Sequence, residues 1–266
     1  MVLRVENLTK RYSETTALSE VSFEIPDGTF AVVLGESGAG KSTLLRILNG
    51  LTEPTSGGVY IDDEEITNSR SDVGMVFQQH NLVEELSAYS NALTGTLNRT
   101  GFLRSLLSRQ PAAEKELALE ALETVGLLDE AGQTVRSMSG GQQQRVGIAR
   151  ALVQQPELLL ADEPVASLDP SSAETVMAYL RETAKTRDLT TLASLHQVNI
   201  AREFGEQFIG LKQGRVVFTG SREELTTDVL EEIYGHIETE ELREESDPEA
   251  MIDAATEENT GIGAKP

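Results

Sequence analysis

The stretch 35–42, GESGAGKS, carries the residue types that bind a phosphate chain. It matches G-x-x-x-x-G-K-[ST] at every fixed position and follows an apolar run at 30–34. Its glycines let backbone N–H groups turn inward around a phosphate, and a helix starting near Lys41 adds the positive end of its dipole. We expect Lys41 to contact the β- and γ-phosphates and Ser42 to bind Mg²⁺. The motif alone predicts a nucleoside triphosphate site whose candidate residues are Gly35, Glu36, Ser37, Gly38, Ala39, Gly40, Lys41, Ser42 and Thr43.

Two adjacent carboxylates, Asp162 and Glu163, follow the apolar run 158–161. Neighbouring acids at a strand end are unfavourable unless a positive group binds there, and ligands of open α/β sheets bind at that end. We expect Asp162 to hold Mg²⁺, directly or through water. We expect Glu163 to point the other way along the pleat and to polarise an attacking water. Taken alone, this run could also be two solvent-exposed acids before Pro164. The phosphate-binding motif elsewhere in the chain favours the metal site.

The elements around these residues alternate between strands and helices. Lys41 to Asn49 is predicted to be a helix that ends at Gly50. From about 79 to 154 apolar residues recur at helical spacing, which predicts a helical insert. This order favours an α/β fold with a mainly parallel sheet. Strands are predicted at residues 3–5, 21–25, 30–34, 58–61, 73–77, 158–162 and 191–196.

A third motif, SGGQQQR at 139–145, lies between the first two. Ser139 is suited to cap the helix that follows, and Gly140 and Gly141 permit close approach of a phosphate. With Met138 in front, the run resembles the ABC signature L-S-G-G-Q, and Met replaces the usual Leu at similar volume. Over residues 1–220 the chain therefore resembles the ATP-binding subunits of ABC transporters.

The resemblance includes four more positions, in family order, and implies a role for each. Gln78 resembles the glutamine that contacts Mg²⁺ and signals to the membrane subunit. Asp169, in the run SLD at 167–169, resembles the D-loop acid. His196 resembles the switch histidine that contacts the γ-phosphate, and Tyr12 lies where the family has an aromatic residue that stacks on adenine. Together these imply catalytic roles for Glu163, His196 and Gln78, Mg²⁺ ligation by Ser42, Gln78 and Asp162, and nucleotide contacts from Tyr12, Ser139, Gly140, Gly141, Gln142 and Asp169.

The same resemblance implies an architecture and an assembly. It implies a P-loop NTPase (RecA-like) core, an N-terminal antiparallel β subdomain and a helical subdomain insert at about 79–154. The ATPase domain is expected to span 1–237. Residues 238–266 are acidic and poor in large apolar side chains, which predicts a disordered tail. Two copies are expected to sandwich ATP and Mg²⁺, the signature segment of each covering the ATP held by the other, through a two-fold interface.

Composition excludes several classes of protein. The net charge of −22 disfavours nucleic acid and anionic lipid as partners. Sixteen arginines but only six lysines, with 44 acids, resemble proteins from a salt-rich cytoplasm such as that of haloarchaea. The absence of cysteine excludes disulfides, thiol catalysis and cysteine metal sites. No apolar run has membrane-spanning length, and no signal-peptide core is present, so we expect a peripheral subunit at the cytoplasmic face of the cell membrane that needs a separate permease.

The transported solute can be inferred only from resemblance. The stretches similar to the ATPase of phosphonate importers are 77–83, 101–107, 139–152, 161–170 and 195–198. The doubled glutamine 78–79 and LHQV at 195–198 discriminate best, whereas His80 departs from the expected aromatic. This implies phosphonate uptake with membrane permease subunits and an extracytoplasmic solute-binding protein.

Other readings of the sequence remain. An importer of phosphate, phosphite, a polar amino acid or a metal chelate is the main alternative, because the similar stretches touch ATP or permease and never the solute. A non-transport ABC protein is disfavoured by the single ATPase unit, the short insert and the charge. A P-loop kinase is disfavoured by the signature and by His196.

Overall fold

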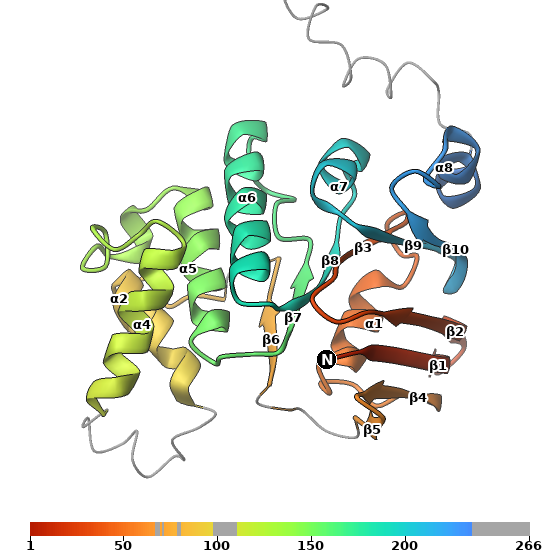
Figure 1. Ribbon diagram of the computed structural model, residues 1–266, viewed down its shortest axis with the longest axis horizontal. Coiled ribbons are helices and arrows are strands. Elements are labelled where there is room, and N and C mark those ends of the chain that lie inside the picture. The colour runs from red at the N-terminus through yellow and green to blue at the C-terminus, as the bar shows by residue number, and fades with distance from the viewer. Residues whose placement is uncertain (67–69, 71, 79–80, 98–110, 236–266) are drawn as a thin grey trace, which may run out of the picture.

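The phosphate-binding sequence joins β3 (Phe30–Leu34) to α1 (Lys41–Leu48), as predicted. β3 lies inside a six-stranded sheet of order β10-β9-β3-β8-β7-β6 (Figure 1). All its neighbouring pairs are parallel except β10 with β9, which confirms the mainly parallel sheet. The computed structural model describes residues 1–66, 70, 72–78, 81–97 and 111–235. The remaining strands of this sheet are β6 (Val73–Val76), β7 (Leu158–Asp162), β8 (Thr190–Ser194), β9 (Gln207–Lys212) and β10 (Arg215–Ser221).

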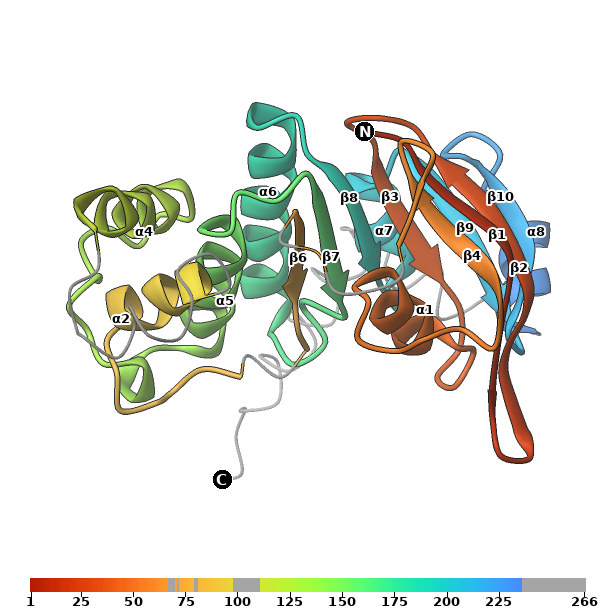
Figure 2. The same ribbon diagram turned by 90° about the horizontal axis from the view of Figure 1, so that it is seen from below.

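Both faces of this sheet are covered, which explains why its central strands are so apolar. Every residue of β3, β7 and β8 is buried. Along β3, Phe30, Val32 and Leu34 pack into one hydrophobic cluster, whereas Ala31 and Val33 pack into another on the opposite face. The helix α1 covers the second face (Figures 1 and 2). The first face is covered by α5 (Gly140–Leu152), α6 (Pro170–Thr186), α7 (Val198–Phe204) and α8 (Thr227–Tyr234).

A second, antiparallel sheet of order β2-β1-β4-β5 is built from the N-terminal part of the chain. Its strands are β1 (Leu3–Tyr12), β2 (Thr15–Ile25), β4 (Ser56–Ile61) and β5 (Glu64–Glu65). The predicted strands 3–5 and 21–25 were too short. The missed part is a hairpin whose tip, around residues 11–16, is exposed, so its polar residues carry no alternating pattern.

The described residues between β6 and β7 are mainly helical, in agreement with the helical spacing there. The helices α2 (Ala88–Leu93), α4 (Ala112–Thr124) and α5 pack on one another beside the sheet (Figure 1). The short 3₁₀ helices Thr94–Thr96 and Val135–Ser137 complete the described part. Fully or almost fully buried Ala88, Ala92, Ala118 and Ala121 line these contacts, because small side chains let the helices approach closely.

Some predictions fall outside the described residues. These are the stretch 101–107, His80, and the acidic tail 238–266. The limits 1–237 and 79–154 therefore stay predictions. Among the described residues no helix has the length and apolar character needed to cross a membrane.

Candidate nucleotide site

The loop 35–42 has the glycines that its path requires. Gly40 precedes α1 with φ of 108°, and a Cβ there would lie 2.6 Å from the Ala17 carbonyl oxygen. At Gly35 a Cβ would lie 2.2 Å from the Leu211 carbonyl oxygen. Any larger residue at either position would collide with backbone atoms, so the loop closes tightly only with glycine there.

A cavity of about 260 Å³ opens over this loop. Glu163 lines it from the other side, and β2 contributes three residues that the sequence did not suggest. No local pattern marks those three, because only the packing of β2 beside the loop brings them there. Gly35, Glu36 and Ala39 belong to the loop but do not line the cavity. The lining consists of Thr15, Thr16, Ala17, Ser37, Gly38, Gly40, Lys41, Ser42, Thr43 and Glu163.

Lys41 supplies the positive charge of this cavity. Its side chain is buried, and Nζ donates to the carbonyl oxygens of Gly35, at 2.6 Å, and Glu36, at 3.1 Å. Burial lowers the pKa of Lys41, and the nearby Glu163 and Asp162 carboxylates partly oppose that shift. An ammonium group held by neutral carbonyls next to an open cavity is suited to a multiply charged anion such as a phosphate chain.

Asp162 and Ser42 form the candidate metal site. The buried Asp162 ends β7, and its Oδ1 accepts a hydrogen bond of 3.0 Å from Ser42 Oγ. A hydroxyl and a carboxylate oxygen are the ligands that Mg²⁺ prefers, with phosphate and water oxygens filling its other positions. The described residues contain no cluster of three or more His, Cys, Asp or Glu side chains.

Glu163 lies in a turn just beyond β7. β7 ends at Asp162, and Glu163 has a left-handed backbone with φ of 47°, so the alternation of a strand no longer decides where its side chain points. Glu163 lines the same cavity as Ser42, and its Oε1 contacts His196 Nε2. A left-handed non-glycine residue costs about 1–3 kcal/mol, so other contacts must hold it.

Ser194 provides one of those contacts, and no sequence pattern predicted it. The fully buried hydroxyl accepts from the Glu163 N–H at 2.9 Å and donates to Asp162 Oδ1 at 3.1 Å. β8 ends at this residue, so His196 lies beyond the strand and not at its end as predicted. One hydroxyl thus fixes both acids at the end of β7.

We expect Ser194→Ala to lower kcat about tenfold while ATP affinity changes little, because Asp162 loses a donor and the Glu163 N–H is left unpaired. The free energy of unfolding should also fall by about 1–3 kcal/mol. Steady-state ATPase assays and thermal melts measure the two effects. Thr191→Val, which removes another buried hydroxyl of β8, is the matched control and should lower stability only. Equal kcat in the two variants would contradict a role for Ser194 in the site.

The signature segment forms a second, separate cavity. Ser139 caps α5 in a capping box with Gln142, the Ser139 Oγ accepting from the Gln142 N–H at 3.2 Å. This cavity has a volume of about 160 Å³ and shares no lining residue with the first. It lies between the first two turns of α5 and of α6 and is lined by Ser139, Gly141, Gln142, Arg145, Ser171, Ser172, Thr175 and Val176.

Asp169, Gln78 and Tyr12 line neither cavity, and the same is true of Gly140, Asp162 and His196. Asp169 caps α6 by accepting from the Ser172 N–H at 3.0 Å, and this bond holds the pKa of Asp169 below its usual value. Gln78 is exposed just after β6. Tyr12 is 45% exposed near the β1–β2 hairpin tip, with Lys10 Nζ 4.9 Å from its ring centre. Their roles stay predictions.

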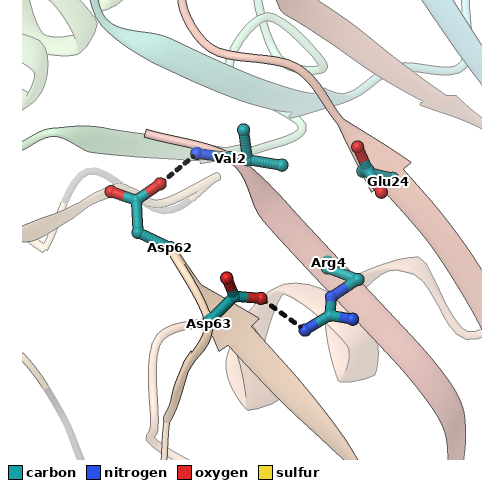
Figure 3. A pocket seen from close by; sticks show the side chains of 5 residues that line it. All are labelled: Val2, Arg4, Glu24, Asp62 and Asp63. Atoms are coloured by element: carbon teal, nitrogen blue, oxygen red, sulfur yellow. Dashed lines mark hydrogen bonds and ion pairs between the residues drawn. The ribbon is translucent and has the colours of Figure 1, made fainter.

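A larger cavity, of about 360 Å³, lies in the antiparallel sheet (Figure 3). Arg4 is paired there with Asp63 at 2.8 Å, and Asp62 accepts from the Val2 N–H at 2.7 Å. None of the residues that line it was predicted to be functional. Volume alone therefore does not select the nucleotide site.

Comparison with known proteins decides the family. A sequence profile of the ABC transporter family matches residues 18–166, a span that contains the loop 35–42, the signature and both acids. The chain belongs to the ABC transporter family. As an ABC ATPase, it binds and hydrolyses ATP. The family match does not test the individual roles of Lys41, Asp162 and Glu163, which stay predictions.

Relatives and solved structures support this placement. The chain is 61% identical to the phosphonates import ATP-binding protein PhnC of Halobacterium salinarum, over 98% of this chain and 94% of that protein. It is 49% identical to PhnC of Thiobacillus denitrificans, over 87% and 92%. The dimeric cassette MJ0796 with bound ADP and Pi matches with a TM-score of 0.71 at 35% identity, over 83% and 98%. The haloarchaeal relative agrees with the acid-rich, lysine-poor composition.

Proposed function

We propose that two copies of this ATPase clasp ATP and Mg²⁺ between the loop 35–42 of one copy and the Ser139 helix end of the other. The observation that carries this is the division of the site: one chain has two cavities with no lining residue in common. Each cavity is open on its own, and a two-fold pairing would join each to its counterpart. The similar cassette MJ0796 is dimeric in its structure with ADP and Pi.

The residues of the loop and the acids have distinct tasks in hydrolysis. Lys41 and the loop amides bind the β- and γ-phosphates and stabilise charge as it develops there. Ser42 and Asp162 would hold Mg²⁺, which neutralises phosphate charge when bound. Glu163 orients the attacking water and accepts its proton, and His196 holds the Glu163 carboxylate beside the γ-phosphate.

We expect the dipole of α5 to stabilise the phosphates of the nucleotide that is bound to the partner copy. The N-terminus of this helix carries a partial positive charge, and Ser139 and Gly141 line the cavity at its end. In the dimer this end would face the γ-phosphate from the side opposite Lys41. ATP then joins the two copies, and hydrolysis followed by release of the phosphate removes the charge that holds them together.

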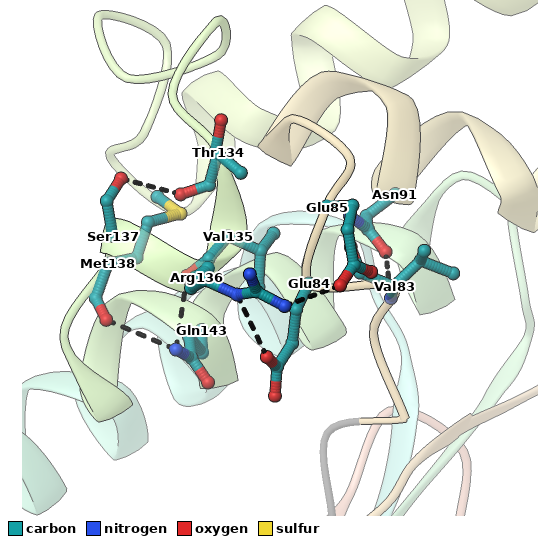
Figure 4. A network of polar contacts seen from close by, with 10 residues as sticks. All are labelled: Val83, Glu84, Glu85, Asn91, Thr134, Val135, Arg136, Ser137, Met138 and Gln143. Atoms are coloured by element: carbon teal, nitrogen blue, oxygen red, sulfur yellow. Dashed lines mark hydrogen bonds and ion pairs between the residues drawn. The ribbon is translucent and has the colours of Figure 1, made fainter.

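We assign the docking of the permease to the segment after Gln78. Val83 and Leu86 expose 48% and 39% of their surface there, as apolar docking residues do. Buried Asn91 shapes this segment, donating to the Val83 carbonyl oxygen at 3.0 Å and accepting from its N–H at 2.8 Å (Figure 4). Docking on an integral membrane permease would place the subunit at the cytoplasmic face of the membrane, working with an extracytoplasmic solute-binding protein.

We propose phosphonates as the transported solute, because curated relatives at 61% and 49% identity are named for phosphonate import. The test uses vesicles that contain this ATPase with its companion permease, with the solute-binding protein added outside. Methylphosphonate is expected to raise the ATPase rate and to enter the vesicles, and inorganic phosphate is expected to do neither at equal concentration. Stimulation by phosphate, or by a polar amino acid, and not by methylphosphonate would overturn the choice of solute while leaving the ATPase assignment intact.

A further inference from the structure

The last residue of α8, Tyr234, touches the first residue of the phosphate loop. The Gly35 N–H donates to the Tyr234 hydroxyl oxygen at 3.3 Å. The carbonyl oxygen of the same glycine accepts the 2.6 Å bond from Lys41 Nζ. Gly35 is therefore held on one side by the C-terminal helix and on the other by the lysine that is expected to bind phosphate.

α8 is fixed firmly enough to act as a support. Ile233 is fully buried against β9, where a Cβ on Gly210 would lie 2.6 Å from the Ile233 side chain. Lys212 of β9 donates to the Glu232 carbonyl oxygen, which fixes the end of the helix. Gly35 itself lies directly against β9, because a Cβ on it would come within 2.2 Å of the Leu211 carbonyl oxygen. The loop is thus enclosed from behind by β9 and α8.

The hydroxyl of Tyr234 keeps one chemical form in this place. Burial raises its pKa to about 12, and the bond from Gly35 opposes that shift only in part. The hydroxyl is consequently protonated and neutral near pH 7. A neutral oxygen accepts the Gly35 N–H without adding a negative charge near the phosphates.

We propose that Tyr234 is a positioning residue of the nucleotide site, which holds Gly35 so that the loop is already closed around the phosphate position before ATP binds. The proposal rests on ATP binding by the loop 35–42. Residue 234 lies outside the span 18–166 that matches the family profile, so the site extends to the C-terminal helix. A preformed loop binds more tightly because less ordering is required on binding.

The test compares the Tyr234→Phe variant with the wild-type protein, both as full-length chains. The variant keeps the ring and loses only the hydroxyl, so exchange of the Gly35 amide hydrogen, followed by NMR, should accelerate. The Kd for ATP and for ADP should rise about three- to tenfold, as expected for one lost hydrogen bond, while kcat at saturating ATP should stay within about twofold. Tyr60→Phe, in the antiparallel sheet, is the control and should change none of these.

Each other outcome is decisive. Faster Gly35 exchange with unchanged Kd values, unchanged Gly35 exchange, or a lower Tm with unchanged Kd would overturn the positioning role. If the wild-type protein bound no ATP, the proposed function itself would fail. Wild-type binding with identical affinity in Tyr234→Phe would remove only the proposal for Tyr234.

Discussion

Glu163→Gln is expected to bind ATP with nearly unchanged affinity, to lower kcat by about 10²–10⁴, and to remain dimeric for as long as ATP is present. The amide keeps the size of the carboxylate and can still accept from His196 Nε2, so the left-handed turn at residue 163 should be retained. It cannot accept the proton of the attacking water. Nucleotide therefore stays as triphosphate between the two copies. Light scattering with ATP and with ADP measures the dimer, and phosphate release measures turnover.

The control for this result is Glu182→Gln, which makes the same carboxylate-to-amide replacement at an exposed residue of α6. It should hydrolyse ATP at the wild-type rate and should dimerise only transiently. A Glu163→Gln protein that turned over at the wild-type rate would show that another group activates the water. Loss of ATP binding in the same variant would show that Glu163 serves the nucleotide and not the water.

A mixture of two inactive variants is expected to recover activity, because each lacks a different half of the site. Lys41→Met removes the phosphate-binding ammonium, and Gly141→Asp places a negative charge at the end of α5 that faces the triphosphate. Each homodimer then has two defective sites. A mixed dimer has one site in which both halves are intact, so an equal mixture should reach about a quarter of the wild-type rate if pairing is random and sites are independent.

The outcome of the mixing experiment separates two arrangements. If the Ser139 helix end acted on the ATP of its own chain, both variants would remain inactive in any mixture. A mixture of Lys41→Met with Ser42→Ala is the matched control, since both lie in the loop 35–42 and no intact pair can form. Recovery of activity in that control would show that the activity of a mixture does not come from mixed dimers with one intact site.

Residues close together in the sequence determined the first half of the site. The loop 35–42 is one contiguous strand–loop–helix unit, and its glycines and Lys41 have their function wherever the rest of the chain lies. The apolar strand before Asp162 likewise marks the buried end of a parallel sheet. The order of apolar runs was enough to predict an α/β fold, because burial on both faces leaves strands such as β7 uninterrupted by polar residues. Local composition therefore determined the phosphate loop, the acids and the class of fold.

Only the tertiary structure decided which residues meet. Ser42 bonds to Asp162 across 120 positions, Ser194 to Glu163 across 31, and Gly35 to Tyr234 across 199. The parallel register of β7 and β8 pairs Asp162 with Ser194 and so brings the serine to the acids. The pattern of apolar residues along the chain does not predict that register. The direction of Glu163 depends on a left-handed turn held by the same serine. A sequence pattern reports which side chains are buried, whereas contacts between distant strands and helices depend on how the sheet is ordered and packed.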